Sequence, residues 1–385
     1  MKCVVSIILV LMPFLQGCGL SGAYIYFGDR SWSKYLESIK DPKKSTQAEE
    51  YLQAAYGNYK DSLTYDDRRY PLVYKKLADA RYKMTLNPSS AIGELRRAPT
   101  VILETPELQA SLGKYTFFKA KATPNNSNHN KLITDSKDYY RSALLAKPLN
   151  PEFNAGLLKV FFYEIEKNKF EAKEFKNKYL LAQVDDLLEN VEGDNAVQVE
   201  ESRGISAYIR GDYKVAIEKL STVVQGYGYH LQDSNSAYYL ARSYVEDKSY
   251  TEAIEITSAA LLKDEGNFLM RGERTLAYFM KGETSAGTLD LEWMEKNIAD
   301  YHEFYFRVGA LFSNQNLAKK AELYLLKAFR MNGGNGNYAY ALGQNSLLEG
   351  NTRAAKKFFN RAKSLAPAGS NLEKRAQQKL TEIGS

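Results

Sequence analysis

The chain has 385 residues, of which 44% are hydrophobic, so it is long and apolar enough to bury a large core. Its 52 lysines and arginines exceed its 46 aspartates and glutamates, which gives a net charge of +6, and both signs are interspersed along the chain. The sequence contains no block of basic residues, and we therefore expect no nucleic-acid partner.

The first predicted element is a secretory signal peptide over residues 1–17. Lys2 supplies a basic start, an apolar stretch runs from Cys3 to Leu15, and small residues precede the expected cleavage point. The stretch is shorter than the about 20 residues that a membrane-spanning helix needs. A cysteine, Cys18, stands at the cleavage point, and the only other cysteine of the sequence would leave with the signal peptide.

The four residues Leu15-Gln16-Gly17-Cys18 resemble the lipobox of bacterial lipoproteins. The resemblance implies that Cys18 becomes the acylated N-terminus of the mature protein. A lone free thiol would be unusual in the oxidising periplasm, and acylation would consume it. An aspartate after the cysteine retains enterobacterial lipoproteins at the inner membrane, so Gly19 implies a lipid anchor in the outer membrane, facing the periplasm. The alternative is an ordinary secretory signal with a chance cysteine.

Residues 18–30 are predicted to be the acylated cysteine and a flexible tether, because two glycines and a serine lie between Gly19 and Ala23. The aromatic-rich run from Tyr24 to Phe27 leaves two interpretations open. It could lie at the lipid interface, or it could pack under the first helix.

Residues 31–195 are predicted to form helix pairs of a degenerate repeat. Leu112 and Gly113 have the pattern of a core pair in the first helix of a repeat, and Ala143 fits the second helix. The polar segment at residues 123–128 predicts a loop, and His129 beside it is expected to be solvated.

A repeat with a period of 34 residues becomes clear in the second half of the chain. Gly309 and Gly343 are 34 residues apart, and so are Ala321 and Ala355. Small residues at such positions let two helix backbones approach closely, and Pro367 ends the last repeat. The period is the length of a tetratricopeptide (TPR) unit, which is a pair of antiparallel helices.

Over residues 196–368 the chain resembles the TPR family in five consecutive units, and the whole chain resembles a bacterial TPR lipoprotein. The resemblance implies an all-α fold, a right-handed superhelical solenoid of antiparallel helix pairs. Residues 369–385 are predicted to form a C-terminal capping helix that shields the last repeat.

The sequence carries no constellation typical of catalysis. Its three histidines, His129, His230 and His302, are far apart, and no cysteine lies near them. The TPR family is a scaffold without catalytic residues. We therefore expect no enzyme activity, no metal and no cofactor.

The candidate binding surface is the face of each first helix that turns away from its second helix, because in this family that face lines the concave groove. Tyrosine and arginine are enriched at binding hot spots. The predicted partner-binding residues are Tyr208, Asn235, Tyr238, Arg242, Phe306, Asn314, Tyr340 and Gln344. An extended segment of another protein would place its main chain on the arginine and the amides and its apolar side chains on the rings. The alternative is that these rings only pack between neighbouring first helices.

Two functions remain open. The first is a non-enzymatic scaffold, anchored in the outer membrane, that binds other envelope proteins in assembly or export, as in pilus, secretin or polysaccharide machinery. The second is a lipoprotein that binds or processes carbohydrate or peptidoglycan on a helical solenoid. A processing enzyme would need a catalytic domain of about 100–150 residues. Repeats occupy nearly all of the mature chain, which favours the scaffold.

Overall fold

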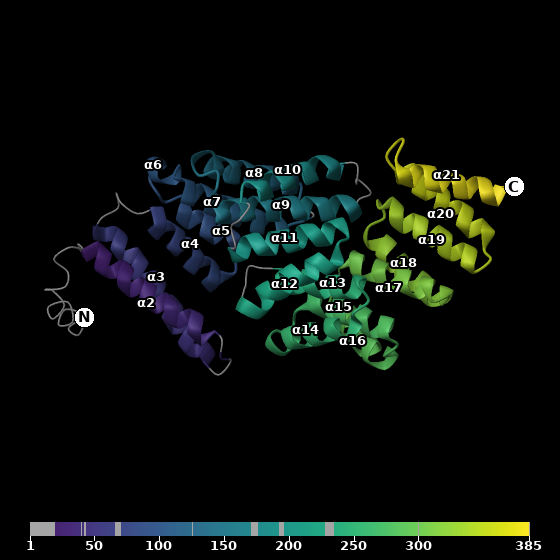
Figure 1. Cartoon of the computed structure of the whole chain (residues 1–385), viewed down its shortest axis with the longest axis horizontal. Coiled ribbons are helices and arrows are strands. Elements are labelled where there is room, and N and C mark those ends of the chain that lie inside the picture. Colours follow the sequence, from purple (N-terminus) through teal and green to yellow (C-terminus); the bar gives the residue numbers. More distant parts are fainter. Residues whose placement is uncertain are drawn as a thin grey trace. The chain divides into compact units, whose positions relative to one another are not determined.

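The computed structural model describes residues 20–39, 41, 44–65, 71–124, 126–170, 176–191, 196–227, 235–298 and 300–384. The predicted signal peptide, Cys18 and His230 lie outside these residues. In the described part of the chain every regular element is a helix, which confirms the all-α prediction (Figure 1). None of the described helices combines the length and the apolar character that crossing a membrane requires.

The chain divides into two compact units, one up to Val160 and one from Phe161 onward. The division falls inside α9 (Pro151–Phe170), whereas the sequence placed the start of the regular repeats at residue 196. The end of α9 belongs with the second unit because Glu166, which lies on it, forms an ion pair with Arg242.

The first unit consists of helices that pack in succession, with α2 on α3 and α7 on α8. These helices are α2 (Leu20–Ser38), α3 (Ser45–Tyr65), α4 (Pro71–Thr85), α5 (Pro88–Leu95), α6 (Thr100–Leu103), α7 (Pro106–Ala122), α8 (His129–Ala146) and the start of α9. A Cβ atom built at Gly113 would lie 2.8 Å from the ring of the buried Tyr140. Glycine therefore permits the close approach of α7 and α8, as the sequence predicted for this position.

The prediction of a flexible tether up to residue 30 is wrong for its described part, because α2 begins at Leu20. Ala23 is buried, and a Cβ atom at Gly28 would overlap the ring of Tyr59 on α3. Small residues thus serve here as a packing surface for α3. Within the aromatic-rich run, Ile25 packs on the cluster around Tyr59, while Tyr26 is exposed.

The prediction that His129 is solvated is also wrong. The segment before it is a loop, as expected, but His129 is the first residue of α8 and is only 3% exposed. Its Nδ1 lies 3.1 Å from the carbonyl oxygen of Ala120, so the imidazole joins the end of α7 to the start of α8.

The second unit continues from α9 and α10 (Asn177–Glu189) into five helix pairs and a final helix. The pairs are α11 (Val197–Arg210) with α12 (Tyr213–Tyr227), α13 (Ser236–Glu246) with α14 (Tyr250–Lys263), α15 (Phe268–Lys281) with α16 (Thr284–Asn297), α17 (His302–Asn314) with α18 (Ala318–Met331), and α19 (Gly336–Leu348) with α20 (Thr352–Leu365). The final helix, α21 (Asn371–Gly384), packs on α20 through the buried Leu372 and Ala376.

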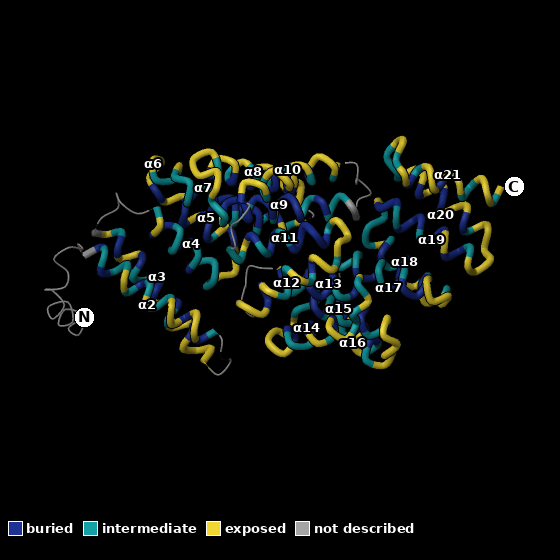
Figure 2. Tube along the Cα trace, viewed as in Figure 1, coloured by how far each residue is buried: buried dark blue, intermediate teal, exposed yellow. Residues whose placement is uncertain are grey.

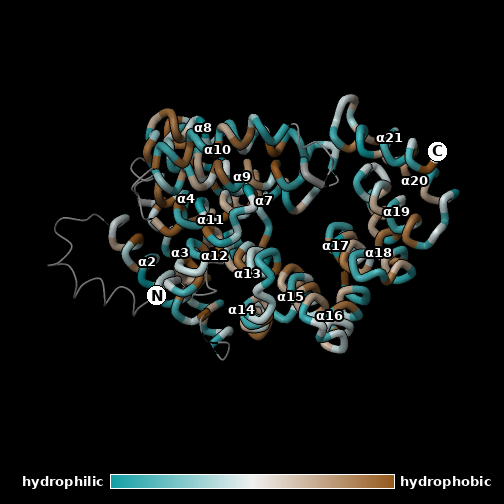
Figure 3. Tube along the Cα trace, turned by 45° about the vertical axis from the view of Figure 1, so that its right-hand side comes forward, coloured by the Kyte–Doolittle hydropathy of each residue, from teal (hydrophilic) through white to brown (hydrophobic). Residues whose placement is uncertain are grey.

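Small residues allow the helices of each pair to approach, as the 34-residue period predicted. A Cβ atom at Gly309 would lie 2.8 Å from Leu325, and one at Gly343 would lie 2.7 Å from the ring of Phe359. Ala321 has no exposed surface. Figure 2 shows the buried residues along the helices of these pairs and the exposed residues at many of their turns. In Figure 3 hydrophobic and hydrophilic segments alternate along α17 to α20, as amphipathic packing requires.

The turn between the two helices of each pair repeats one backbone conformation with positive φ. Glycine occupies this position in three pairs, namely Gly211, Gly282 and Gly350, with φ of 83°, 91° and 73°. Lys248 and Asn316 occupy it in the other two, with φ of 66° and 59°. This left-handed conformation costs a residue with a Cβ roughly 1–2 kcal/mol, so the repeat geometry imposes strain at Lys248.

The α15–α16 pair departs from the repeat pattern and is stabilised by charge. Asp290 on α16 is 4% exposed. Arg271 donates to it at 2.8 Å, and Arg274 donates to both of its oxygens at 2.7 and 2.8 Å. The guanidinium of Arg271 also lies 4.2 Å from the ring centre of Trp293. This arrangement supplies interhelical contacts where the usual alanines are missing.

Candidate partner-binding site

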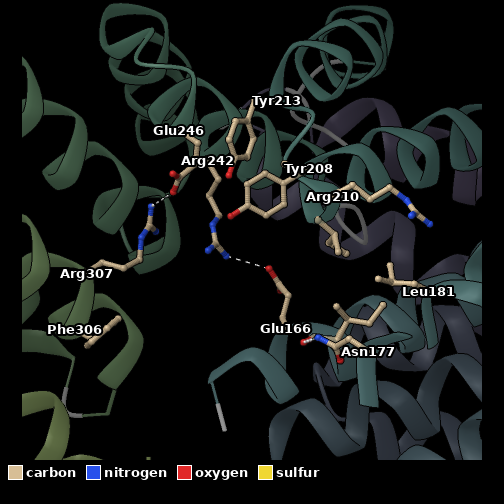
Figure 4. Close-up of a pocket in the computed structure, with 13 residues that line it drawn as sticks. Glu166, Asn177, Leu181, Tyr208, Arg210, Tyr213, Arg242, Glu246, Phe306 and Arg307 are labelled. Atoms are coloured by element: carbon tan, nitrogen blue, oxygen red, sulfur yellow. Dashed lines mark hydrogen bonds and ion pairs between the residues drawn. The ribbon is translucent and has the colours of Figure 1, made fainter. Parts of the chain in front are cut away.

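A cavity of about 450 Å³ lies in the second unit, between the first helices of the repeats and the end of α9. Figure 4 shows Arg242 pointing toward Glu166 and Arg307 pointing toward Glu246, with the ring of Tyr208 beside Arg242. The lining residues are Ile165, Glu166, Asn177, Leu181, Tyr208, Ile209, Arg210, Gly211, Tyr213, Arg242, Glu246, Phe306 and Arg307.

Helical spacing explains how α13 supplies this site. Tyr238, Arg242 and Glu246 follow one another at intervals of four residues, so they lie on one face of α13. Phe306 and Arg307 lie on α17 and reach the same cavity. Side chains from α11, α13 and α17 therefore line one cavity, although these helices are far apart in sequence.

Arg242 is the centre of a buried ionic network. Its side chain is 6% exposed, and its Nη1 lies 3.1 Å from Glu166 and donates a 3.1 Å hydrogen bond to the hydroxyl of Tyr238. Its Nη2 is 3.2 Å from Glu303, and its Nε is 3.9 Å from Glu273. The guanidinium is therefore committed to three carboxylates.

Arg307 forms the second cationic centre of the network. It donates a short hydrogen bond to Glu273, and its Nη2 lies 3.7 Å from Glu246. Tyr239, Glu273 and Arg307 occupy the same repeat position at intervals of 34 residues. Equivalent positions of adjacent repeats are neighbours in a solenoid, so this register explains the pairing of Glu273 with Arg307.

Tyrosine rings surround the charges. The hydroxyl of Tyr239 donates a 2.8 Å hydrogen bond to Glu166. The guanidinium of Arg242 lies 5.1 Å from the ring centre of Tyr208 and 5.3 Å from that of Tyr238. These rings shield the ion pairs from water, and burial raises the pKa of Tyr208 well above its ordinary value.

The network leaves some buried polar atoms without hydrogen-bond partners among the described residues. These atoms are Arg242 Nε, Glu273 Oε2 and Glu303 Oε1. Burial raises the pKa of the Glu303 carboxyl, against the opposing effect of Arg242. Burial alone would lower the pKa of Arg242, but the nearby tyrosines and carboxylates more than offset it, so Arg242 is cationic.

The structure brings together part of the predicted binding surface. Tyr208, Arg242 and Phe306 line the cavity, and Tyr238 contacts Arg242. The expectation that Arg242 is open to a partner's main chain is wrong, because its buried guanidinium already pairs with the carboxylates of Glu166, Glu273 and Glu303.

The other predicted residues do not line this cavity. Tyr340 is 6% exposed and packs against Phe359, with Arg375 of α21 over its ring at 4.5 Å. The final helix therefore covers Tyr340. Asn235, Asn314 and Gln344 are exposed, the first two at the ends of α13 and α17.

Several of the predicted rings do pack between neighbouring first helices, as the alternative interpretation proposed. Tyr208 of α11 meets Tyr239 of α13 with ring centres 5.4 Å apart. Phe306 of α17 stacks on Tyr338 of α19 at 4.5 Å. The same aromatic side chains thus join successive repeats and, for Tyr208 and Phe306, also line the cavity.

The comparisons with known proteins agree at the level of the fold. The sequence matches no protein-family model and no curated protein. Among solved structures, the chain is similar to the human IFIT1 dimer with m7Gppp-AAAA, at 16% identity, a TM-score of 0.51 and coverage of 94% of this chain and 86% of that one.

Two further solved structures carry the TPR name. One is a tetratricopeptide repeat protein from Parabacteroides merdae, at 14% identity and a TM-score of 0.47, covering 71% of this chain and 99% of that one. The other is a thermophilic TPR protein of Thermus thermophilus, at 20% identity and a TM-score of 0.41, covering 48% and 100%. The protein's own helix pairs, in their 34-residue register, define it as an all-α, TPR-like solenoid, a fold that generally mediates protein–protein interactions.

Proposed function

We propose that the protein is a non-enzymatic scaffold of the bacterial envelope, anchored by acylated Cys18 in the outer membrane and facing the periplasm. In this proposal its cavity binds a segment of another envelope protein, in an assembly or export machine of the pilus, secretin or polysaccharide kind. The observation that carries the binding role is the cavity of about 450 Å³, lined by paired charges and aromatic rings, on a fold suited to holding partners.

The anchor rests on the run Leu15-Gln16-Gly17-Cys18. Acyl chains contribute about 0.8 kcal/mol per buried methylene, and two or more chains hold a protein firmly on a membrane. Cells that express Cys18→Ser and are fed an alkyne fatty acid should yield no labelled protein. Cys3→Ser is the matched control, because it lies inside the predicted signal peptide and should keep the label. A labelled Cys18→Ser protein, or a mature form that begins elsewhere, would refute the anchor.

The scaffold role is tested by in-cell cross-linking followed by purification of the protein. Arg242→Ala is unsuitable for this purpose, because removing one member of a buried ion pair costs about 3–5 kcal/mol and would destabilise the fold. Tyr213→Ala is preferable, since Tyr213 lines the cavity and is only partly buried. This variant should lose its cross-linked partner, whereas Leu262→Ala, at an 87% exposed position on α14, should retain it. Equal recovery of the partner by both variants would contradict the proposal.

A saccharide is the second candidate ligand. The cavity combines the rings of Tyr208 and Tyr213 with the carboxylate of Glu166 and the amide of Asn177, a mixture that can stack on and hydrogen-bond to a sugar. Sedimentation of the purified protein with peptidoglycan sacculi separates the two candidates. Binding that Tyr213→Ala abolishes would favour the carbohydrate function, and the absence of co-sedimentation would favour the scaffold.

A further inference from the structure

We infer that the cavity accepts a cationic group, the side chain of an arginine or lysine in the partner's segment, and that Glu166 and Glu246 bind it. The inference rests on the proposed function, because it specifies the chemistry of the partner that the scaffold would hold. It is carried by the charge, the exposure and the remaining hydrogen-bonding capacity of the groups around the cavity.

The first argument is charge. The network contains two guanidiniums, Arg242 and Arg307, and the carboxylates of four glutamates. These glutamates are Glu166, Glu246, Glu273 and Glu303. Among the described residues that line the cavity, the remaining cation is Arg210, which is paired with Asp185. Carboxylates therefore exceed cations, and a bound cation would reduce the imbalance.

The second argument is exposure. The side chains of Glu166 and Glu246 are 23% and 39% exposed, whereas those of Arg242 and Arg307 are 6% and 16% exposed. Both glutamates line the cavity. Within the network, a ligand that enters therefore reaches these two carboxylates more readily than the two guanidiniums, and the 40% exposed Arg210 at the cavity is paired with Asp185 (Figure 4).

The third argument is hydrogen-bonding capacity. Behind the cavity wall, Glu273 Oε2 and Glu303 Oε1 are buried acceptors without a hydrogen-bond partner among the described residues. Burial raises the pKa of the Glu303 carboxyl even though its Oε1 lies 3.2 Å from Arg242 Nη2. Arg242 Nε is the corresponding donor without a partner, and it is buried. An anionic ligand would thus find few accessible donors, since the guanidiniums already serve the protein's own carboxylates.

The aromatic lining is consistent with a cationic occupant. The rings of Tyr208 and Tyr213 are 5.9 Å apart and both line the cavity. Guanidinium and ammonium groups bind favourably over tyrosine faces, and more so where water is excluded. A long side chain such as arginine can place its methylenes against Leu181 while its charge reaches the glutamates.

The test uses three blocked tripeptides and the full chain purified in detergent. The peptides are acetyl-Ala-Arg-Ala-amide, its citrulline analogue, which has nearly the same shape without the charge, and acetyl-Ala-Glu-Ala-amide. Binding is measured by ligand-observed NMR titration. The arginine peptide should bind at least about tenfold more tightly than the citrulline and glutamate peptides, as charge-assisted hydrogen bonds predict.

Variants assign the binding to the named glutamates. Glu246→Gln should weaken the arginine peptide about tenfold, and its fold should persist because Glu246 is well exposed and lies 3.7 Å from Arg307. Glu166→Gln should weaken binding of the arginine peptide by a similar factor. The side-chain oxygen of the new glutamine can still accept the hydrogen bond from Tyr239. Glu255→Gln, at an exposed position of α14, is the matched control and should change nothing.

Any of four outcomes would overturn the inference. The first two are equal binding of the arginine and citrulline peptides and tighter binding of the glutamate peptide. The other two are unchanged affinity in Glu246→Gln and absence of saturable binding by the arginine peptide. The scaffold role is tested separately, by the loss of a cross-linked partner in Tyr213→Ala. If that partner is lost while the peptide experiment fails, the scaffold role is supported and only the cationic ligand is refuted.

Discussion

Gly309→Ala should destabilise the protein, although alanine is the better helix former. Gly309 lies within α17, and a Cβ atom there would lie 2.8 Å from Leu325 Cγ and 2.9 Å from the backbone nitrogen of Leu325. A backbone atom of α18 cannot rotate away, so the two helices must separate. Overpacking of this kind costs about 1–3 kcal/mol. The higher helix propensity of alanine offsets about 1 kcal/mol of this cost, which leaves a net loss of stability of up to about 2 kcal/mol.

Gly226→Ala is the matched control, because it is the same substitution within α12, where a Cβ atom would meet no atom of the described residues within 4 Å. It should raise the free energy of unfolding by up to about 1 kcal/mol. The melting temperature, measured by circular dichroism, should therefore fall for Gly309→Ala and rise for Gly226→Ala, by about 2–4 °C per kcal/mol. If Gly309→Ala were as stable as Gly226→Ala, the close approach of α17 and α18 would be refuted.

Three further predictions concern packing, backbone strain and charge. Ala355→Leu should cost about 1–3 kcal/mol by overpacking α20, whereas the exposed Lys356→Ala should stay within about 0.5 kcal/mol, and equal denaturation midpoints would show that the repeat frame is wrong. Lys248→Gly should stabilise the protein by about 1 kcal/mol, because glycine adopts a φ of 66° without strain. A lower melting temperature for this variant would contradict the prediction. The raised pKa of Glu303 means that the folded protein holds this proton more tightly than the unfolded chain, a stabilisation present at low pH and lost as the pH rises through the raised pKa. The melting temperature of Glu303→Gln, relative to the unsubstituted protein, should therefore rise as the pH increases from below the ordinary glutamate pKa through the raised pKa of Glu303, and a constant difference would count against the buried carboxylate.

The fold of the second unit could be predicted because its signals are local and periodic. Positions such as Gly309, Gly343 and Ala321 recur at the repeat length, and each marks a contact between helices close together in sequence. The strained turn at Lys248 carries no such signal, because lysine gives no indication of positive φ.

The first unit was harder to predict because packing overrides composition there. The glycines and serine near Leu20 suggested a linker, yet small residues also let a helix lie close to its neighbour, as Gly28 does beneath Tyr59. Similarly, His129 stands in a polar segment, but the carbonyl of Ala120 provides a buried partner that the sequence does not reveal.

The candidate site could be predicted only in part. Helical spacing placed Tyr238 and Arg242 on one face, but Glu166, the partner of Arg242, lies 76 residues away, outside the regular repeats, and no period indicates it. The pair Glu273 and Arg307 could have been found, because opposite charges at the same position of adjacent repeats are expected to meet.

The most direct test of the account is photo-cross-linking in intact cells from the wall of the cavity. The full chain would carry p-benzoylphenylalanine in place of Tyr213, or in place of the exposed Leu262 as a control. We predict a light-dependent adduct from position 213 alone, whose cross-linked peptide, identified by mass spectrometry, contains an arginine or lysine next to the site of attachment. Adducts from position 262 with none from position 213 would contradict the claim that this cavity holds the partner.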